Sequence, residues 1–106
     1  MSVPQLTPRE LAERLASGQP ITVIDVREPW EHGIAHLASA RHIPLGALAA
    51  AEAELPRDRD VVFVCHHGAR SQAAAEYFAA RGIRAVNLSG GIDAWSRDVD
   101  PTVPRY

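Results

Sequence analysis

The chain has 106 residues and a formal net charge of −2, and these two values already limit its function. A chain of this length can bury one hydrophobic core but not two, so any binding site must lie on the surface of one domain. The small net charge and an aromatic content of only 6% argue against a basic nucleic-acid surface, an anionic-membrane surface and a platform of stacking side chains.

The N-terminal segment carries a helix start and no targeting signal. Residues 1–6 lack a basic stretch followed by a long apolar run, so we expect neither a secretory signal nor a membrane span, and a cytoplasmic location. Residues 7–10 (Thr-Pro-Arg-Glu) match a capping box with proline at the first helical position, which predicts a helix from Pro8 that ends before Gly18. The β-branched run over residues 21–26 then predicts a buried strand.

The secondary-structure patterns in the middle of the chain are weaker. Pro29 restarts a short turn or helix, and residues 40–44 are typical of a brief extended piece ended by its proline. The neighbouring Trp30 is expected to anchor the core, because the chain is poor in aromatic residues. Residues 46–55 are rich in Ala, Leu and Glu and predict a helix, which the charged turn of residues 56–60 closes.

The second half of the chain repeats the alternation of strand and helix. Residues 61–64 predict an apolar strand, and residues 71–81 have helical spacing. Residues 83–88 predict another strand and residues 92–97 a last helix, followed by an irregular tail over residues 98–106. Strands separated by helical segments of about ten residues predict an α/β fold with a mostly parallel central sheet and helices on both faces, in which ligands bind at the carboxyl ends of the strands.

Cys65, the single cysteine, directly follows the predicted strand of residues 61–64. A thiol in this place faces the N-terminus of the next helix, whose positive dipole end and free backbone N–H groups favour a thiolate. A lone cysteine is often an inert buried residue, but two histidines and a glycine follow this one, and these are not core-strand residues. We therefore interpret Cys65 as a nucleophile. One cysteine allows no internal disulfide, which agrees with a reducing compartment.

Four residues separate Cys65 from Arg70, so the loop can close a tight arc whose backbone N–H groups point inward as an anion-binding nest. Protein-tyrosine-type phosphatases have a similar loop with five residues between cysteine and arginine, and the wider loop holds the three oxygens of a phosphate. The shorter arc favours a terminal sulfur over a tetrahedral oxyanion. A phosphatase or an arsenate reductase stays an alternative.

Three segments resemble the rhodanese family, the thiosulfate and related sulfurtransferases. Residues 65–71 (Cys-His-His-Gly-Ala-Arg-Ser) resemble the active loop of that family. Residues 24–31 resemble its early Asp-x-Arg-Glu segment, and residues 88–95 resemble its late Gly-Gly-x-x-x-Trp segment. The motifs occur in the family's order and cover most of the chain, so the resemblance implies a single rhodanese-like domain over residues 1–106.

The resemblance also implies a reaction. Cys65 would take up sulfane sulfur as a persulfide from a donor such as thiosulfate and deliver it to a thiophilic acceptor, which is cyanide in vitro and a thiol or a protein in the cell. Arg70 would attract the anionic donor, or would instead be a structural arginine paired with a carboxylate. The donor-binding loop would comprise His66, His67, Gly68, Ala69, Arg70 and Ser71. The two histidines would assist donor binding or be polar loop residues only.

Other polar residues have structural interpretations. Asp25 and Arg27 lie at a predicted strand end and would brace the neighbouring loops by hydrogen bonds. His32 and His36 have a spacing that suits a metal on a helix, but Gly33 interrupts that helix and no third ligand stands nearby. We therefore predict no metal site and no cofactor.

Two further classes of function compete with an enzyme. The chain could be a partner-binding or sulfur-sensing module, or a carrier that hands sulfur to one protein only; the intact cysteine and arginine argue against an inactive module. Residues 99–106 resemble the tail of rhodanese domains fused to adenylyltransferases that supply sulfur to small ubiquitin-like carriers. The expected partners are a small anionic sulfur donor and a thiol or protein acceptor, with no nucleic acid and no membrane. No heptad pattern occurs, so a monomer is the default.

Overall fold

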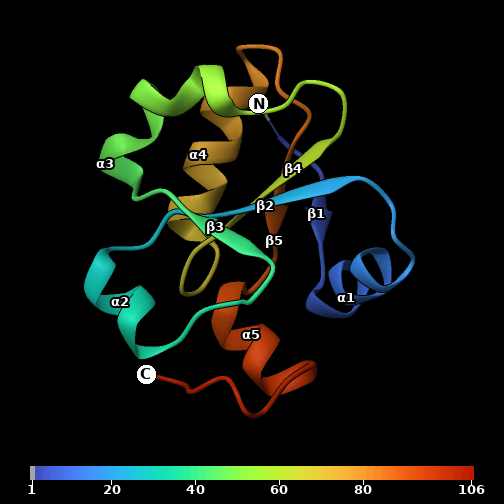
Figure 1. Ribbon diagram of the computed structural model, residues 1–106, viewed down its shortest axis with the longest axis vertical. Coiled ribbons are helices and arrows are strands. Elements are labelled where there is room, and N and C mark those ends of the chain that lie inside the picture. Colours follow the sequence, from blue (N-terminus) through green and yellow to red (C-terminus); the bar gives the residue numbers. More distant parts are fainter. Residues whose placement is uncertain (1) are drawn as a thin grey trace.

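The computed structural model describes residues 2–106, and a parallel sheet forms its centre (Figure 1). The strands are β1 (Gln5–Leu6), β2 (Ile21–Asp25), β3 (Ala40–His42), β4 (Asp60–Val64) and β5 (Ala85–Leu88). They form one sheet in the order β1-β5-β4-β2-β3, and every neighbouring pair is parallel. Parallel neighbours need a crossover, which the helices between the strands supply. The predicted α/β fold with a parallel sheet is confirmed.

Helices cover both faces of this sheet. On one face α1 (Pro8–Ala16) and α5 (Gly91–Asp98) pack through buried residues such as Leu11 and Ile92. On the other face lie α3 (Leu45–Leu48), a 3₁₀ helix η1 (Ala49–Glu54) and α4 (Ala69–Ala79). The short helix α2 (Pro29–Ile34) follows the carboxyl end of β2 (Figure 1). None of the helices in residues 2–106 has the length and apolar character that a membrane crossing requires.

The central strand β4 explains why its sequence is continuously apolar. Val61 and Phe63 pack into the core beneath α4, whereas Val62 and Val64 pack into the core beneath α1 and α5. All four are at most 1% exposed. Successive side chains of a strand point to opposite faces, so a strand covered on both faces needs apolar residues at every position.

The start of α1 follows its sequence signal closely. The Thr7 hydroxyl accepts a hydrogen bond from the Glu10 backbone N–H at 3.2 Å, and the Glu10 carboxylate accepts one from the Thr7 backbone N–H at 2.8 Å. These two bonds satisfy N–H groups that a helix start would otherwise leave free. The predicted capping box is confirmed.

Several predicted boundaries are wrong. Residues 46–55 do not form one α-helix, because α3 ends at Leu48 and the 3₁₀ helix η1 follows it. The strand predicted from residue 83 starts at Ala85, because the Ile83 N–H donates to the Phe78 carbonyl at the end of α4. The strand β1 was not predicted, since two residues carry no readable alternation.

Two further differences concern the site and an aromatic side chain. The helix α4 begins at Ala69 and not at Ser71, so the end of the cysteine loop is already helical. Trp30 does not anchor the core, because 64% of it is exposed on α2. The N-terminus of α2 carries Pro29 at its first position, and this favourable start accounts for the short helix without help from a buried tryptophan.

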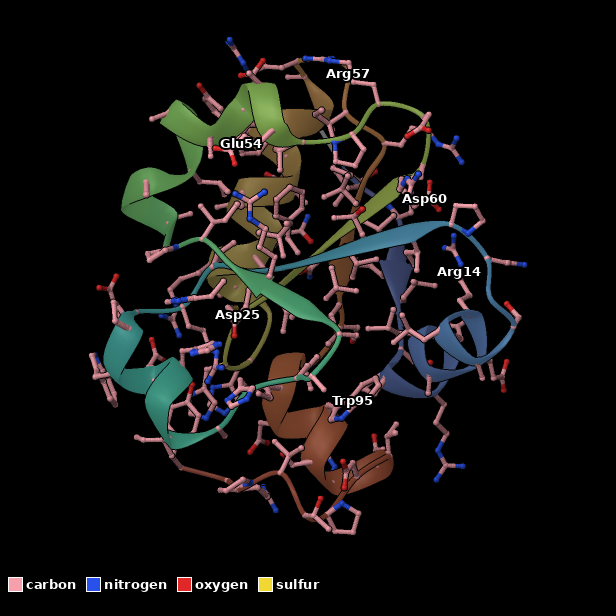
Figure 2. The ribbon with its side chains drawn as sticks, viewed as in Figure 1. Arg14, Asp25, Glu54, Arg57, Asp60 and Trp95 are labelled. Atoms are coloured by element: carbon pink, nitrogen blue, oxygen red, sulfur yellow. The ribbon has the colours of Figure 1, made fainter. Side chains whose placement is uncertain are left out.

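The two ends of the sheet differ in their charge pairs (Figure 2). At the amino end of β4, Arg14 forms an ion pair with Asp60, with 3.0 Å between Nη1 and Oδ2. Asp25 lies at the opposite, carboxyl end of β2 (Figure 2). The carboxyl ends of β2, β4 and β5 meet at this second edge, where parallel sheets place their ligands.

Candidate active site

Cys65 lies at the carboxyl end of the central strand, at the place that the sequence predicts. It follows β4 directly and is 1% exposed. Residues 66–68 form a short loop that leads into α4, and β2 and β5 flank β4 on either side. The sulfur therefore lies at the carboxyl end of the middle strand of the sheet.

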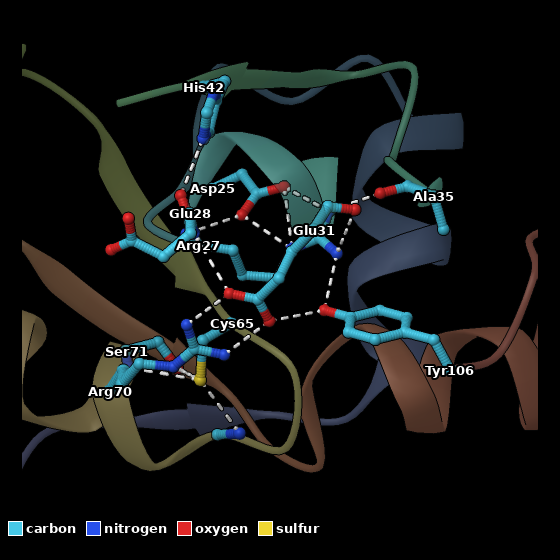
Figure 3. A network of polar contacts seen from close by, with 11 residues as sticks. Asp25, Arg27, Glu28, Glu31, Ala35, His42, Cys65, Arg70, Ser71 and Tyr106 are labelled. Carbon is cyan, nitrogen blue, oxygen red and sulfur yellow. Dashed lines mark hydrogen bonds and ion pairs between the residues drawn. The ribbon is translucent and has the colours of Figure 1, made fainter. Parts of the chain in front are cut away.

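Three polar groups converge on the Cys65 sulfur (Figure 3). The Gly68 backbone N–H donates to Sγ at 3.1 Å, and the Ser71 backbone N–H donates at 3.4 Å. The Ser71 hydroxyl lies 3.2 Å from the same atom. Both amides belong to the N-terminal turn of α4, whose free N–H groups carry the positive end of the helix dipole. This arrangement would stabilise negative charge on Sγ, or on a sulfur atom bound to it.

Asn87 sets the orientation of the Ser71 hydroxyl. Its amide nitrogen donates to the Gly68 carbonyl at 3.2 Å and to Gln5 Oε1 at 2.9 Å, so its Oδ1 faces Ser71. The Ser71 hydroxyl donates to that oxygen at 2.5 Å. A hydroxyl has one hydrogen, so in this orientation its oxygen is free to accept the S–H hydrogen of Cys65. After the thiol ionises, the hydroxyl can turn and donate to Sγ instead.

The N-terminus of α5 holds the cysteine loop in place through two backbone hydrogen bonds. The Ile92 N–H donates to the Cys65 carbonyl at 2.9 Å, and the Asp93 N–H donates to the His66 carbonyl at 3.1 Å. The backbone at Gly91 has φ +61° and passes so close that an added Cβ would lie 2.4 Å from the His66 oxygen and 2.5 Å from the Cys65 oxygen. Glycine is required here both by the dihedral angle and by the lack of space.

Arg70 forms a two-bond ion pair with Glu31 from α2. Its Nη1 and Nη2 donate to Oε1 and Oε2 at 2.6 Å and 2.8 Å. The Glu31 side chain is 4% exposed and that of Arg70 36%. Hydrogen bonds from Arg70, and to a smaller extent from Tyr106, lower the pKa of Glu31 to about 2 despite its burial, so this carboxylate is ionised at neutral pH. The structure thus pairs Arg70 with a carboxylate, the second of the two interpretations that the sequence allowed.

Asp25 and Arg27 form a buried ion pair behind this one. The shortest distance between them is 2.7 Å, from Arg27 Nη2 to Asp25 Oδ2, and their side chains are at most 1% exposed. Arg27 also donates to the carbonyls of Ala35 and Glu31 and to the hydroxyl of Tyr106. Asp25 and Arg27 therefore connect the end of β2 to the middle and the C-terminal end of α2 and to the tail, and neither has a hydrogen bond to Cys65 (Figure 3).

Aromatic rings line the loop beside the thiol. The His66 ring stacks on Tyr106 with ring centres 3.9 Å apart and an angle of 7°, and on His67 at 3.9 Å and 30°. Burial lowers the pKa of His66, and the neighbouring His67 lowers it further, so His66 is neutral at neutral pH. Its Nε2 is buried and has no hydrogen-bond partner within residues 2–106.

The structure brings together one group with metal-binding geometry that the sequence did not indicate. His66, His67 and Asp93 each offer a ligand atom, and these atoms lie within 4.8 Å of one another. Asp93, however, is already paired with Arg105, with 3.0 Å between Oδ1 and Nε. A cation would have to displace this arginine, so the donor set fits a resident metal poorly.

The predicted loop residues thus come from one continuous segment. His66, His67 and Gly68 form the loop, and Ala69, Arg70 and Ser71 form the first turn of α4. Sequence reasoning did not identify the partners from elsewhere in the chain, which are Glu31, Asn87 and Tyr106. Glu31 stands within residues 24–31, but nothing in that pattern signals that it is buried against Arg70. The sequence allowed a carboxylate partner for Arg70 but did not indicate which acidic residue it is.

Comparison with known proteins gives a consistent result. A family model described as the rhodanese-like domain matches residues 7–98. A protein of Allochromatium vinosum named "Sulfurtransferase" is 36% identical over 102 residues, which cover 95% of this chain and 95% of that protein. The solved structure of a rhodanese-like domain protein from Staphylococcus aureus has a TM-score of 0.85 at 29% identity and covers 98% of this chain and 99% of its own.

A further relative is much longer than this chain. The "Probable adenylyltransferase/sulfurtransferase MoeZ" of Mycobacterium tuberculosis is 40% identical over 104 residues, or 95% of this chain. The chain spans only 26% of the length of that relative. The similarity therefore concerns one part of MoeZ and not its whole activity.

Proposed function

The chain belongs to the rhodanese-like domain family, and we propose that it transfers sulfane sulfur through a persulfide on Cys65. One observation carries this proposal: two backbone N–H groups and a hydroxyl converge on a single buried thiol at the N-terminus of α4. Such a site suits a sulfur anion, because fixed donors stabilise charge without having to reorganise. The named sulfurtransferase relative supports sulfur transfer as the general activity.

In the first half-reaction the Cys65 thiolate attacks the outer sulfur of the donor. A bond forms between Sγ and that sulfur, and the bond between the outer sulfur and the rest of the donor breaks. With thiosulfate as the test donor, sulfite leaves with the electron pair. The negative charge then lies on the outer sulfur of the persulfide, where the donors of Gly68 and Ser71 can stabilise it.

In the second half-reaction an acceptor nucleophile attacks the outer sulfur. The sulfur–sulfur bond of the persulfide breaks, and Cys65 leaves as a thiolate that the same donors stabilise. Cyanide would leave as thiocyanate, and a thiolate would leave as a new persulfide. No general base is needed, since the nucleophile starts and ends each cycle as a thiolate.

The other residues have supporting roles in this proposal. The loop that surrounds the transferred sulfur comprises His66, His67, Gly68, Ala69, Arg70 and Ser71. Asp25 and Arg27 hold the end of β2 and the helix α2 in place behind it. The acceptor is a thiol or a protein, and the physiological location is the cytoplasm, where a free thiol stays reduced.

A mass measurement tests the proposal. The reduced protein is incubated with excess thiosulfate, and its intact mass is measured before and after addition of cyanide. We expect a gain equal to one sulfur atom, its loss with cyanide and the release of thiocyanate, none of which occurs in Cys65→Ser. Loading without discharge to cyanide or a thiol would favour a carrier specific for one protein. Hydrolysis of an aryl phosphate without any sulfur gain would contradict sulfur transfer and favour the phosphatase alternative.

A further inference from the structure

The tail that follows α5 returns to the cysteine loop (Figure 1). Residues 99–106 run back along α5 toward its N-terminus, and Val103 packs against the core on the way. The Arg105 guanidinium then pairs with the Asp93 carboxylate in the first turn of α5, at 3.0 Å and 3.3 Å. The family model matches residues 7–98, so this tail reaches the site from outside the matched segment.

The tail meets the loop through the ring of Tyr106. This ring stacks on that of His66, the residue next to Cys65, with ring centres 3.9 Å apart and an angle of 7°. Trp30 of α2 contacts the same tyrosine edge-on, with 6.2 Å between the ring centres. Parallel stacking buries a large flat area, which restricts the movement of both rings. The Tyr106 side chain therefore lies between the cysteine loop and α2.

The Tyr106 hydroxyl fixes the position of the ring. It donates to Glu31 Oε2 at 2.8 Å and accepts from Arg27 Nη1 at 2.8 Å (Figure 3). Glu31 and Arg27 are both charged, and hydrogen bonds to charged groups are stronger than those between neutral groups. The same Glu31 oxygen also accepts the bond from Arg70 Nη2. One side chain of the tail is thus bound to both ion pairs behind the thiol.

The loop after Cys65 is held from two sides. The Asp93 N–H donates to the His66 carbonyl at 3.1 Å, which holds the backbone. The Tyr106 ring covers the His66 side chain. Two residues further on, the Gly68 N–H donates to the sulfur at 3.1 Å. Because His66 stands between Cys65 and Gly68, a shift of His66 would change the distance between the sulfur and this donor.

We propose that Tyr106 is a positioning residue for sulfur transfer, which holds the cysteine loop in the geometry that binds the sulfur of Cys65. It acts through His66, on which its ring stacks, because the groups that meet Sγ belong to Gly68 and Ser71 and not to Tyr106. The proposal rests on the proposed function and adds a residue from outside the loop to it. A ring that only positions the loop should affect the rate of sulfur uptake and not the binding of the donor.

Three variants separate the ring from its hydroxyl and from a general effect on stability. Tyr106→Phe keeps the ring and removes both hydroxyl bonds. Tyr106→Leu removes the ring as well. Tyr77→Leu is the matched control, because Tyr77 is 47% exposed and lies about two turns along α4 from the loop.

Three measurements are made on each variant and on the wild type. Loading of Cys65 from thiosulfate is followed by intact mass at several donor concentrations, which gives a maximal rate and a half-saturating concentration. Proton NMR records the ring resonances of His66, which lie upfield while the ring current of a stacked tyrosine shields them. Urea unfolding gives the stability of each protein.

We expect Tyr106→Leu to lower the maximal loading rate by about 10- to 100-fold and to change the half-saturating concentration less than about twofold. The His66 resonances should lose their upfield shift in this variant and keep it in Tyr106→Phe. Tyr106→Phe should unfold at a lower urea concentration but load at close to the wild-type rate, because its ring still stacks. Tyr77→Leu should match the wild type in loading and in the His66 resonances.

Several results would overturn the inference. An unchanged maximal rate in Tyr106→Leu would show that the ring covers the loop without positioning the thiol, and a faster rate would show that it obstructs the site. Unchanged His66 resonances would show that the tail does not stack on the loop. If Tyr106→Leu does not fold, His66→Ala removes the same stack from the loop side, and an unchanged maximal rate there would also refute the proposal. Failure of wild-type Cys65 to gain sulfur would refute the proposed function itself, whereas the other results refute this inference alone.

Discussion

Replacement of Gly91 by alanine should displace the backbone of Cys65 and His66 while leaving the Cys65 side chain itself unchanged. The added Cβ would lie 2.4 Å from the His66 oxygen and 2.5 Å from the Cys65 oxygen, and Cβ contacts below 3.0 Å essentially do not occur. The loop would therefore have to move by at least 0.6 Å, the difference between 3.0 and 2.4 Å. Both obstructing atoms belong to the backbone, so no side-chain rotation can relieve the contact.

The expected loss of stability in Gly91→Ala is the sum of a backbone contribution and a hydrogen-bond contribution. An alanine at φ +61° loses about 1 kcal/mol relative to glycine. Movement of the loop strains the two hydrogen bonds that Ile92 and Asp93 donate to the same carbonyls, at about 1 kcal/mol each. We expect Gly91→Ala to lower the free energy of unfolding by about 2–4 kcal/mol. Because Cys65 itself lies on the displaced segment, Sγ would shift relative to its donors Gly68 and Ser71, and loading of Cys65 with sulfur should slow by about 10- to 100-fold.

Gly18→Ala is the matched control. Gly18 has φ +75°, but an added Cβ there would meet no atom within 4 Å. It should cost only the dihedral contribution of about 1 kcal/mol and leave sulfur loading unchanged. Urea unfolding and the rate of persulfide formation, followed by intact mass, are measured for both variants. Equal stability losses and equal loading rates in the two variants would refute the argument that Gly91 supports the loop by its close approach.

Three further predictions follow from the polar network. Asp25→Asn leaves the buried Arg27 without a counter-charge and should lower the free energy of unfolding by about 3–5 kcal/mol in urea titrations; a loss below 1 kcal/mol would contradict the role of this pair. Arg70 lowers the pKa of Glu31 to about 2. The ionised Glu31 therefore contributes about 1–3 kcal/mol to the free energy of unfolding above pH 4.5, and this contribution is lost as the pH falls toward 2. Unfolding measured across that range should show a shallower pH slope in Glu31→Gln than in the wild type, and equal slopes would exclude the linkage. Ser71→Ala removes a hydroxyl 3.2 Å from Sγ and leaves the buried Asn87 Oδ1 without its donor, so it should lower the free energy of unfolding by about 1–3 kcal/mol. It should also slow the alkylation of Cys65 by iodoacetamide, and an unchanged alkylation rate would show that the hydroxyl does not activate the thiol.

Local patterns predicted the elements that are set by local physics. The capping box at Thr7 and Glu10 placed the start of α1 correctly, because the hydrogen bonds that begin a helix join residues three apart. The apolar run of residues 61–64 indicated a strand covered on both faces, and its end placed Cys65. The helix over residues 46–55 was predicted wrongly, because Ala-rich composition favours helix in general and cannot tell an α-helix from the 3₁₀ helix that follows Leu48.

The sequence by itself determined the class of fold, the position of the nucleophile and the arc of residues 65–71, since each depends on residues adjacent in the chain. Tertiary structure alone decided the partners of that arc: Glu31 meets Arg70 across 39 positions, and Asn87 meets Ser71 across 16. The physical reason is the order of the strands. Because β4 lies between β2 and β5, the loop after β4 is enclosed by segments that follow its two neighbours. No local pattern encodes which strands become neighbours, so the partners of the cysteine loop become visible only in the assembled sheet.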